Sequence, residues 1–271
     1  MPELSPIGTL ARRGDPDRFL CALFAPPDRR ESLFALIAFD RELARARAVA
    51  SQPTIALIRL QWWRDAVEAA AAGRPARRHE VAEPLHAAIT AGQLDPADLG
   101  AMIDAREAEV EEESPSPAAF AAWLRGTAGG FAVASGRLLG APPGTLVGLQ
   151  AWGAASGLAR LLGGLAVLAG EEGVSPLPVE LLDGARSADP RDPAVREATK
   201  RLAAEALASL NSARPVLRAL PRQAVAAALP GVLARRDLHR IARDGAPPHP
   251  PAARGAGDRW AVTLAGLRGR V

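Results

Sequence analysis

The stretch DRFLCALFAPPDRRESLFALIAFDRELARARAVASQPTIALIRLQWWRDAVE, residues 17–68, decides the fold of this chain. Its apolar residues recur at helical spacing, and prolines interrupt the pattern in two places. The pattern predicts a helix over residues 28–50 and a second helix over residues 53–72. The second helix is apolar on most sides, so we expect it to be largely buried.

The rest of the chain also reads as helices separated by prolines and glycines. Asp95-Pro96 and Ser116-Pro117 each place a capping side chain directly before a proline suited to the first turn of a helix. Runs of β-branched and aromatic residues typical of strands are missing. We therefore predict an all-α protein. Its further helices are expected over residues 96–113, 117–139, 144–169, 194–213, 215–220 and 223–243.

Length and composition fit one domain. A chain of 271 residues with 48% hydrophobic content can bury a sizeable core. Glycines weaken the helix at 144–169, so we expect close packing at the centre of the domain to offset that cost. We divide the chain into an N-terminal arm (1–16), a helical domain (17–243), a Pro/Gly linker (244–257) and a C-terminal cationic helix (258–271).

The basic character of the chain comes from arginine. Lys200 is the single lysine among 33 basic residues, and the isoelectric point is about 10.2 although the net charge is only +3. Arginine surplus follows genome composition as readily as an anionic partner, so no nucleic-acid partner is predicted. In the cationic helix, Trp260, Leu264 and Leu267 share one side, which gives the hypothesis of peripheral contact with anionic lipid.

No segment of the sequence predicts export or a membrane span. The N-terminus lacks the apolar core of a signal peptide, and no run of about 18 uncharged apolar residues occurs. Cys21 is alone, so it suits a reducing compartment, and we expect it to pack as a small apolar residue. We predict a cytoplasmic protein, peripheral at the inner face of the membrane if the cationic helix binds lipid.

Two further groups of polar residues carry weaker signals. Asp104, Glu107 and Glu111 fall on one helical face, which indicates a solvated or arginine-binding edge. The four histidines lack the spacing of a zinc site, so they predict no metal.

The segment AFDRELARARA, residues 38–48, carries a family resemblance. It is similar to the run A-F-C-R-V-V-D-D-I-V-D of the squalene/phytoene synthase family, and the surrounding residues 17–68 resemble the opening helices of that family. The arginine of the pattern is kept at Arg41, while Ala44 and Ala48 stand at its two aspartate positions. Asp40 lies on the same helical face as these alanines, and Arg45 lies between them.

A second segment, LLGGLAVLAGEE at residues 161–172, resembles the family's Q-L-T-N-I-L-R-D-V-G-E-D. Under this alignment Gly164 replaces the asparagine, Leu168 replaces the first aspartate and Glu172, beside Glu171, replaces the second. The resemblance implies that three of the four carboxylates of a magnesium clamp are missing, because the family carries D-x-x-x-D on two facing helices.

Two further motifs restrict the resemblance to one branch of the family. P-P-x-R-R beginning at Pro26 and R-L-Q-W-W-R beginning at Arg59 are similar to a divergent branch of the family that includes a mitochondrial complex I assembly factor. In this second motif we expect Trp62 to pack in the core, Trp63 to line a second interface or the cavity wall, and Arg64 to pair with a local carboxylate.

The resemblance implies an all-α, isoprenoid-synthase-like, single-domain helical bundle around a central cavity. It assigns no catalytic residue and no metal ligand. Candidate cavity or ligand-binding residues are Asp40, Arg41, Ala44, Arg45, Ala48, Gln61, Arg64, Gly164, Leu168, Glu171 and Glu172.

Two functions compete under this resemblance. The first is a non-catalytic protein without a cofactor, which binds an apolar isoprenoid-like ligand or a protein partner as an assembly factor does. The second is an active head-to-head prenyltransferase, which requires either magnesium held by Asp40, Glu171 and Glu172 or diphosphate held by arginines such as Arg41 and Arg45. Asp40 and the two glutamates are equally well explained as solvated or ion-paired residues without a ligand.

Overall fold

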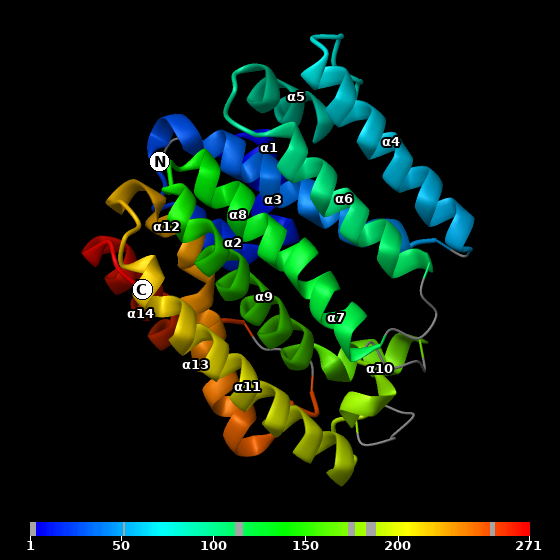
Figure 1. Ribbon diagram of the computed structural model, residues 1–271, viewed down its shortest axis with the longest axis vertical. Helices are drawn as coiled ribbons and strands as arrows, with labels where there is room; N and C mark the ends of the chain where they lie inside the picture. The colour runs from blue at the N-terminus through cyan, green and yellow to red at the C-terminus, as the bar shows by residue number, and fades with distance from the viewer. Residues whose placement is uncertain (1–3, 51, 112–115, 173–176, 183–187, 250–252) are drawn as a thin grey trace.

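The computed structural model describes residues 4–50, 52–111, 116–172, 177–182, 188–249 and 253–271. The expected all-α fold is confirmed, because helices and no strand occur in these ranges (Figure 1). The first half contains α1 (Pro6–Gly14), α2 (Pro16–Ala22), α3 (Pro27–Ala48), α4 (Pro53–Ala71), α5 (Ala82–Thr90), α6 (Pro96–Glu111), α7 (Pro117–Leu124), a π-helical turn η1 (Arg125–Gly129) and α8 (Gly130–Leu138). The second half contains η2 (Pro143–Thr145), α9 (Leu146–Gly163), α10 (Leu165–Glu172), η3 (Val179–Leu182), α11 (Pro193–Leu217), η4 (Arg222–Ala224), α12 (Val225–Ala228), α13 (Pro230–Asp244) and α14 (Ala256–Arg268).

The two helices expected in the opening stretch form as α3 and α4, but the burial predicted for α4 is wrong. Only the stripe that includes Ala56, Leu60 and Trp63 is buried, while Ile55 and Ile58 are exposed. Figure 1 shows why: α4 lies at the outer edge of the bundle and packs on α3, α5 and α6 from one side. An edge helix buries one stripe whatever the composition of its other faces.

The central position expected for the glycine-rich helix is confirmed for α9. This helix packs against α8, η1, α11 and α13. A β-carbon at Gly153 would lie 2.5 Å from the carbonyl oxygen of Ala128 in η1, so only glycine permits this approach of the two backbones. The single helix expected over residues 144–169 is interrupted, because α9 ends at Gly163 and α10 starts at Leu165.

The expected helix at 117–139 also differs in detail, since the π-helical turn η1 separates α7 from α8. The helices expected at 194–213 and 215–220 are largely one, because α11 continues through Pro215 to Leu217. Caps predicted from sequence are confirmed at Asp95, which accepts from the amide of Ala97, and at Ser116, which accepts from the amide of Ala119.

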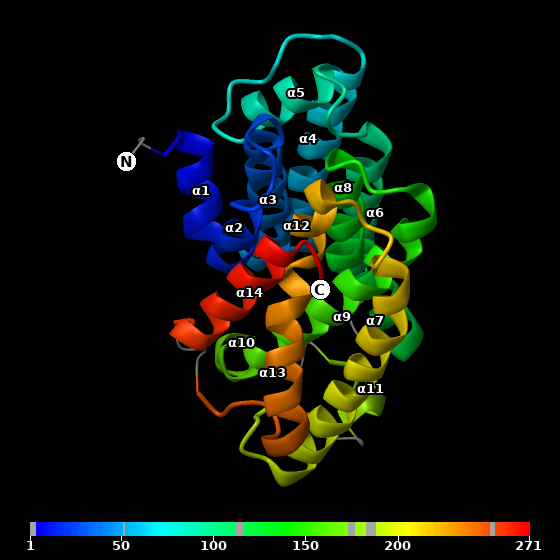
Figure 2. The same cartoon turned by 90° about the vertical axis from the view of Figure 1, so that its left-hand side faces the viewer.

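The first and last helices of the described chain, α1 and α14, both pack on the body of the fold. The segment expected as an N-terminal arm forms α1, whose Ile7 and Ala11 are buried. α14 packs on α13, where Val262 joins Cys21 and Leu233 in a small second core, and Figure 2 shows α14 crossing beside α13. The apolar packing expected for Cys21 is confirmed.

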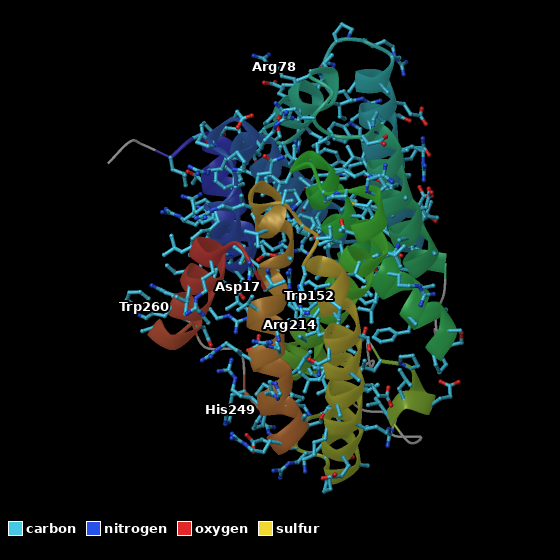
Figure 3. The ribbon with its side chains drawn as sticks, turned by 60° about the vertical axis from the view of Figure 1, so that its left-hand side comes forward. Asp17, Arg78, Trp152, Arg214, His249 and Trp260 are labelled. Carbon is cyan, nitrogen blue, oxygen red and sulfur yellow. The ribbon has the colours of Figure 1, made fainter. Side chains whose placement is uncertain are left out.

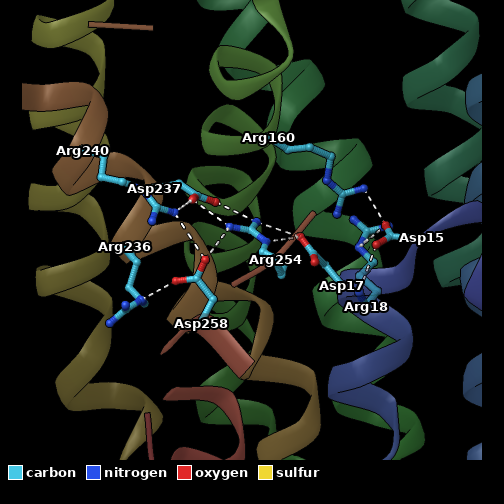
Figure 4. A network of polar contacts seen from close by, with 9 residues as sticks. All are labelled: Asp15, Asp17, Arg18, Arg160, Arg236, Asp237, Arg240, Arg254 and Asp258. Atoms are coloured by element: carbon cyan, nitrogen blue, oxygen red, sulfur yellow. Dashed lines mark hydrogen bonds and ion pairs between the residues drawn. The ribbon is translucent and has the colours of Figure 1, made fainter. Parts of the chain in front are cut away.

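The described part of the predicted Pro/Gly linker is anchored to its neighbours. The amide of Ala246 donates to the hydroxyl of Thr199 at 3.0 Å, and Ala246 itself is buried. Arg254 donates to Asp17 on α2 and to Asp237 on α13, with Nη2 to oxygen distances of 2.7 and 2.8 Å (Figure 4). These contacts hold the chain against the body where it enters α14.

Candidate functional site

The acid that remains in the first motif is engaged by arginine. Asp40 on α3 is 5% exposed, and its Oδ2 accepts a hydrogen bond from Nη1 of Arg18 on α2. Its other oxygen, Oδ1, lies 3.9 Å from Nη2 of Arg106 on α6. Three helices therefore meet at this carboxylate, and two guanidinium groups neutralise it.

Arg18 links the first motif to the start of the second. Its guanidinium lies 3.7 Å from the ring centre of Phe131, and its Nε lies 3.6 Å from Oδ2 of Asp15. Asp15 caps α2 by accepting from the amide of Arg18 at 2.9 Å. The same Asp15 accepts from Nη1 of Arg160 on α9 at 2.6 Å, as Figure 4 shows. Arg160 directly precedes residues 161–172.

The charges of this cluster are balanced. Arg106 also donates to Glu109 at 2.9 Å, so three acids, Asp15, Asp40 and Glu109, face Arg18, Arg106 and Arg160. Burial disfavours ionisation of Asp15, but the charges of Arg160 and Arg18 outweigh it, and the pKa of Asp15 lies below its ordinary value. Asp15 is thus a carboxylate at neutral pH that is already fully engaged.

The other predicted residues of the first motif do not converge on Asp40. Arg45 pairs with Glu42 at 2.8 Å near the surface, and Ala48 is exposed while Ala44 is half-buried. Arg41 is half-buried and packs beside Gly14. Its Nε is buried, and no hydrogen-bond partner for that atom is found in the described ranges.

Gln61 and Arg64 take part in surface pairing. Gln61 donates to Asp65 at 2.7 Å. Arg64 donates to Asp104 and Glu107 on α6 at 2.6 and 2.7 Å, so its expected carboxylate partner is confirmed, and so is the arginine-binding edge at these two acids. The side chain of Glu111 lies outside the described residues.

Of the two tryptophans, Trp63 and not Trp62 is the fully buried one, while Trp62 packs against the core from a half-buried position. Trp63 is 4% exposed and packs edge-on against Phe39, with ring centres 5.5 Å apart. Trp62 is half-buried beside His79 and lies 5.2 Å from the guanidinium of Arg77. The reason is the register of α4, because Trp63 lies three residues after Leu60 on the inward stripe and Trp62 does not.

The second motif offers apolar side chains. Leu168 and its neighbour Val167 are 37% and 36% exposed on α10, and Gly164 lies at the break between α9 and α10. The side chains of Glu171 and Glu172 lie outside the described residues. Their assignment as ligand candidates stays a prediction.

A magnesium cluster does not fit the side chains that the structure describes. Within those ranges no three of His, Cys, Asp and Glu are grouped as a metal ion would need. In the cluster around Asp40, arginines already pair with the carboxylate. The carboxylate of Asp40 is paired with guanidinium groups and is not available as a ligand for a metal ion.

Two pockets on the surface of the described residues leave out Asp40, Arg41 and Leu168. The larger, of about 630 Å³, is lined by Leu4, Pro6, Thr9, Leu10, Arg13 and Glu80. The smaller, of about 270 Å³, lies between α4 and α6 and includes Arg64. Neither pocket is the central cavity that the resemblance implies.

Sequence reasoning missed Asp15, Arg18, Arg106 and Arg160 as partners of the first motif. The pair Asp15-Pro16 carried a local signal, since it is the same capping device as Asp95-Pro96. The ion pairs themselves had no local signal, because Arg18 and Asp40 are 22 residues apart and Asp15 and Arg160 are 145 apart.

The chain belongs to the squalene/phytoene synthase family, whose pattern matches residues 11–263. Its fold is similar to a dehydrosqualene synthase solved in complex with ligand, with a TM-score of 0.80 and 13% identity over 97% of this chain and 94% of that one. It is also similar to squalene synthase HpnC from Alicyclobacillus acidocaldarius, with a TM-score of 0.73 and 18% identity over 90% of this chain and 94% of that one. These likenesses show the fold.

Curated relatives share a shorter region. NADH dehydrogenase (ubiquinone) complex I, assembly factor 6, of Homo sapiens is 34% identical over 105 residues, which are 39% of this chain and 31% of that protein. The protein of the same name from Rattus norvegicus is 35% identical over a region of the same length. The matched region thus spans about a third of these relatives.

Proposed function

We propose that this protein is a non-catalytic member of its family, which acts by binding in the manner of an assembly factor. The observation that carries the proposal is the state of Asp40. The last acid on the motif face of α3 is buried and ion-paired with Arg18 and Arg106, so it is not free to bind a metal ion.

The chemistry of prenyl synthesis explains why this matters. Departure of a diphosphate leaving group requires concentrated positive charge on its oxygens, which bound magnesium ions supply in two-metal sites. In this chain the clamp positions Ala44, Ala48 and Leu168 hold no carboxylate. The guanidinium groups of Arg18 and Arg160 are engaged with Asp40 and Asp15.

A protein partner is better supported than a long apolar ligand. Val49, which follows the end of α3, and Ile55 and Ile58, in the first turns of α4, are each exposed. Exposed apolar side chains near one another in the chain are candidates for a surface that another protein covers. An isoprenoid-like ligand remains the alternative occupant, although neither surface pocket includes a residue of the two segments that resemble the aspartate motifs, 38–48 and 161–172.

A turnover assay tests the proposal. The purified chain is incubated with farnesyl or geranylgeranyl diphosphate, saturating Mg²⁺ and NADPH, and a squalene synthase serves as the positive control. We expect no C30 or C40 product above the protein-free blank. A C30 or C40 hydrocarbon whose formation is lost in Asp40→Asn would overturn the proposal.

The second candidate function is an active head-to-head prenyltransferase. Two observations favour it: the structural neighbours are synthases, and Arg41 keeps a buried Nε without a hydrogen-bond partner in the described ranges. It would use Arg41 toward diphosphate and Glu171 or Glu172 toward magnesium. Turnover that Arg41→Gln and Glu172→Gln both abolish would establish this alternative.

A further inference from the structure

α14 is an amphipathic helix whose apolar side faces outward. Trp260, Leu264 and Leu267 are 71%, 47% and 60% exposed, and their spacing places them on one stripe. Figure 3 shows Trp260 projecting from the outer edge of the molecule, away from the bundle. At this position the indole of Trp260 buries apolar surface only if a partner molecule or a lipid surface covers it.

The opposite side of α14 already packs against the body of the protein, so the exposed stripe is not the side that holds the helix in place. Val262 is buried, and a β-carbon at Gly266 would overlap the ring of Phe24. Buried Asp258 at the start of the helix is paired with Arg236 at 2.6 Å (Figure 4). At its end, Arg222 donates to the carbonyl oxygen of Leu267 at 2.9 Å. The helix is therefore fixed with its orientation decided.

Charge identifies the kind of surface that the stripe fits. Arg259, Arg268 and Arg270 are exposed, and no carboxylate pairs with them in the ranges that the structure describes. Asp258, the single acid of α14, is buried and neutralised by arginines. The outer face of α14 thus combines apolar side chains with positive charge only.

We propose that α14 docks this face, Trp260, Leu264 and Leu267 with their flanking arginines, onto an anionic phospholipid bilayer. The apolar side chains enter the boundary between headgroups and acyl chains, where tryptophan is favoured, and the arginines contact lipid phosphates. A second copy of the chain fits poorly, because two such faces would bring three unpaired arginines against three others. The described helices include none long and apolar enough to span a bilayer, so the contact is made at its surface.

This inference rests on α14 alone and is independent of whether the chain has catalytic activity. It predicts binding by the full-length protein to vesicles of 30% phosphatidylglycerol in phosphatidylcholine, and little binding to pure phosphatidylcholine. Each basic residue near an anionic surface contributes about 1 kcal/mol at low salt, so losing three weakens binding by about a hundredfold. Removing the three apolar side chains weakens vesicle binding by at least about tenfold. The loss is smaller than for fully inserted side chains, because each one buries only part of its surface in the bilayer.

The experiment is vesicle flotation with two triple variants. One changes Trp260, Leu264 and Leu267 to serine, and the other changes Arg259, Arg268 and Arg270 to glutamine. Matched controls change Val147, Val179 and Val216 to serine, or Arg47, Arg59 and Arg78 to glutamine; all six are exposed and lie outside α14. Circular dichroism and thermal melting verify that each variant is folded.

We expect both α14 variants to lose binding and both control variants to keep it. A blue shift of tryptophan emission on adding anionic vesicles should disappear in Trp260→Phe. The proposal would be overturned if the protein bound neutral vesicles equally well, or if the control variants lost as much binding as the α14 variants. It would also be overturned if the protein bound no vesicles and instead formed a dimer in sedimentation that the serine variant of α14 dissociates.

Discussion

Replacement of Asp40 by asparagine tests the central feature of the site. Asp40 and Arg18 are 5% and 6% exposed, so their ion pair lies in the protein interior. Removing one partner of such a pair costs about 3–5 kcal/mol, because the other charge stays buried without compensation. Arg18 keeps Asp15 at 3.6 Å and the ring of Phe131 at 3.7 Å, so we expect the lower end, about 3 kcal/mol.

The measurement is urea unfolding at pH 7, followed by circular dichroism, with thermal melting in parallel. A loss of about 3 kcal/mol corresponds to a fall in Tm of about 6–12 °C for a domain of this size. The double variant Asp40→Leu with Arg18→Met should lose less than the sum of the two single variants, since it leaves no unpaired charge. The control is Glu42→Gln, which removes the surface pair with Arg45 and should cost less than about 1 kcal/mol.

Two outcomes would refute the reasoning. A change of less than about 0.5 kcal/mol in Asp40→Asn would mean that the ion pair is not buried as described. A gain in stability would mean that Asp40 is held without compensation, as catalytic and metal-binding carboxylates often are, and would favour the enzyme hypothesis.

Four further predictions follow from particular residues. The pKa of Asp15 is lower in the folded protein than its ordinary value of about 3.9, so the ionised side chain stabilises the fold above that value. This stabilisation disappears as the pH falls through the folded-state pKa. Asp15→Asn should therefore lower the urea midpoint at pH 7 and lower it progressively less below about pH 4. A β-carbon at Gly231 would overlap the indole of a buried tryptophan, so Gly231→Ala should lower the free energy of unfolding by about 1–3 kcal/mol or more. Gly100 lies within α6 with open space around it, so the control Gly100→Ala should raise the free energy of unfolding by about 0.5–1 kcal/mol. Burial raises the pKa of the Cys21 thiol well above its ordinary value, so the native protein should leave Ellman's reagent unreacted at pH 8 and react within minutes in denaturing urea. Trp63→Ala should cost about 3–5 kcal/mol in chemical unfolding, and a Trp62→Ala variant that cost as much would contradict the burial described for α4.

Local patterns were sufficient for most helix boundaries but not for helix faces. Pro53 begins α4, and Gly73 at φ 66° follows its end, as their backbone preferences require. The same sequence gave no means of choosing between Trp62 and Trp63 as the core residue. Adjacent residues on a helix differ by about 100° in direction, and the inward direction is set by the neighbours that pack on it.

The chain by itself determined an all-α fold, its proline-capped helix starts and the loss of carboxylates at Ala44, Ala48 and Leu168, because each of these depends on residue identity or local spacing. The pairing of Asp40 with arginine and the outward direction of the apolar stripe of α14 depend instead on how the helices pack together. Ion pairs such as Asp15 with Arg160 join residues far apart in the chain, and no local pattern encodes which distant helices will meet.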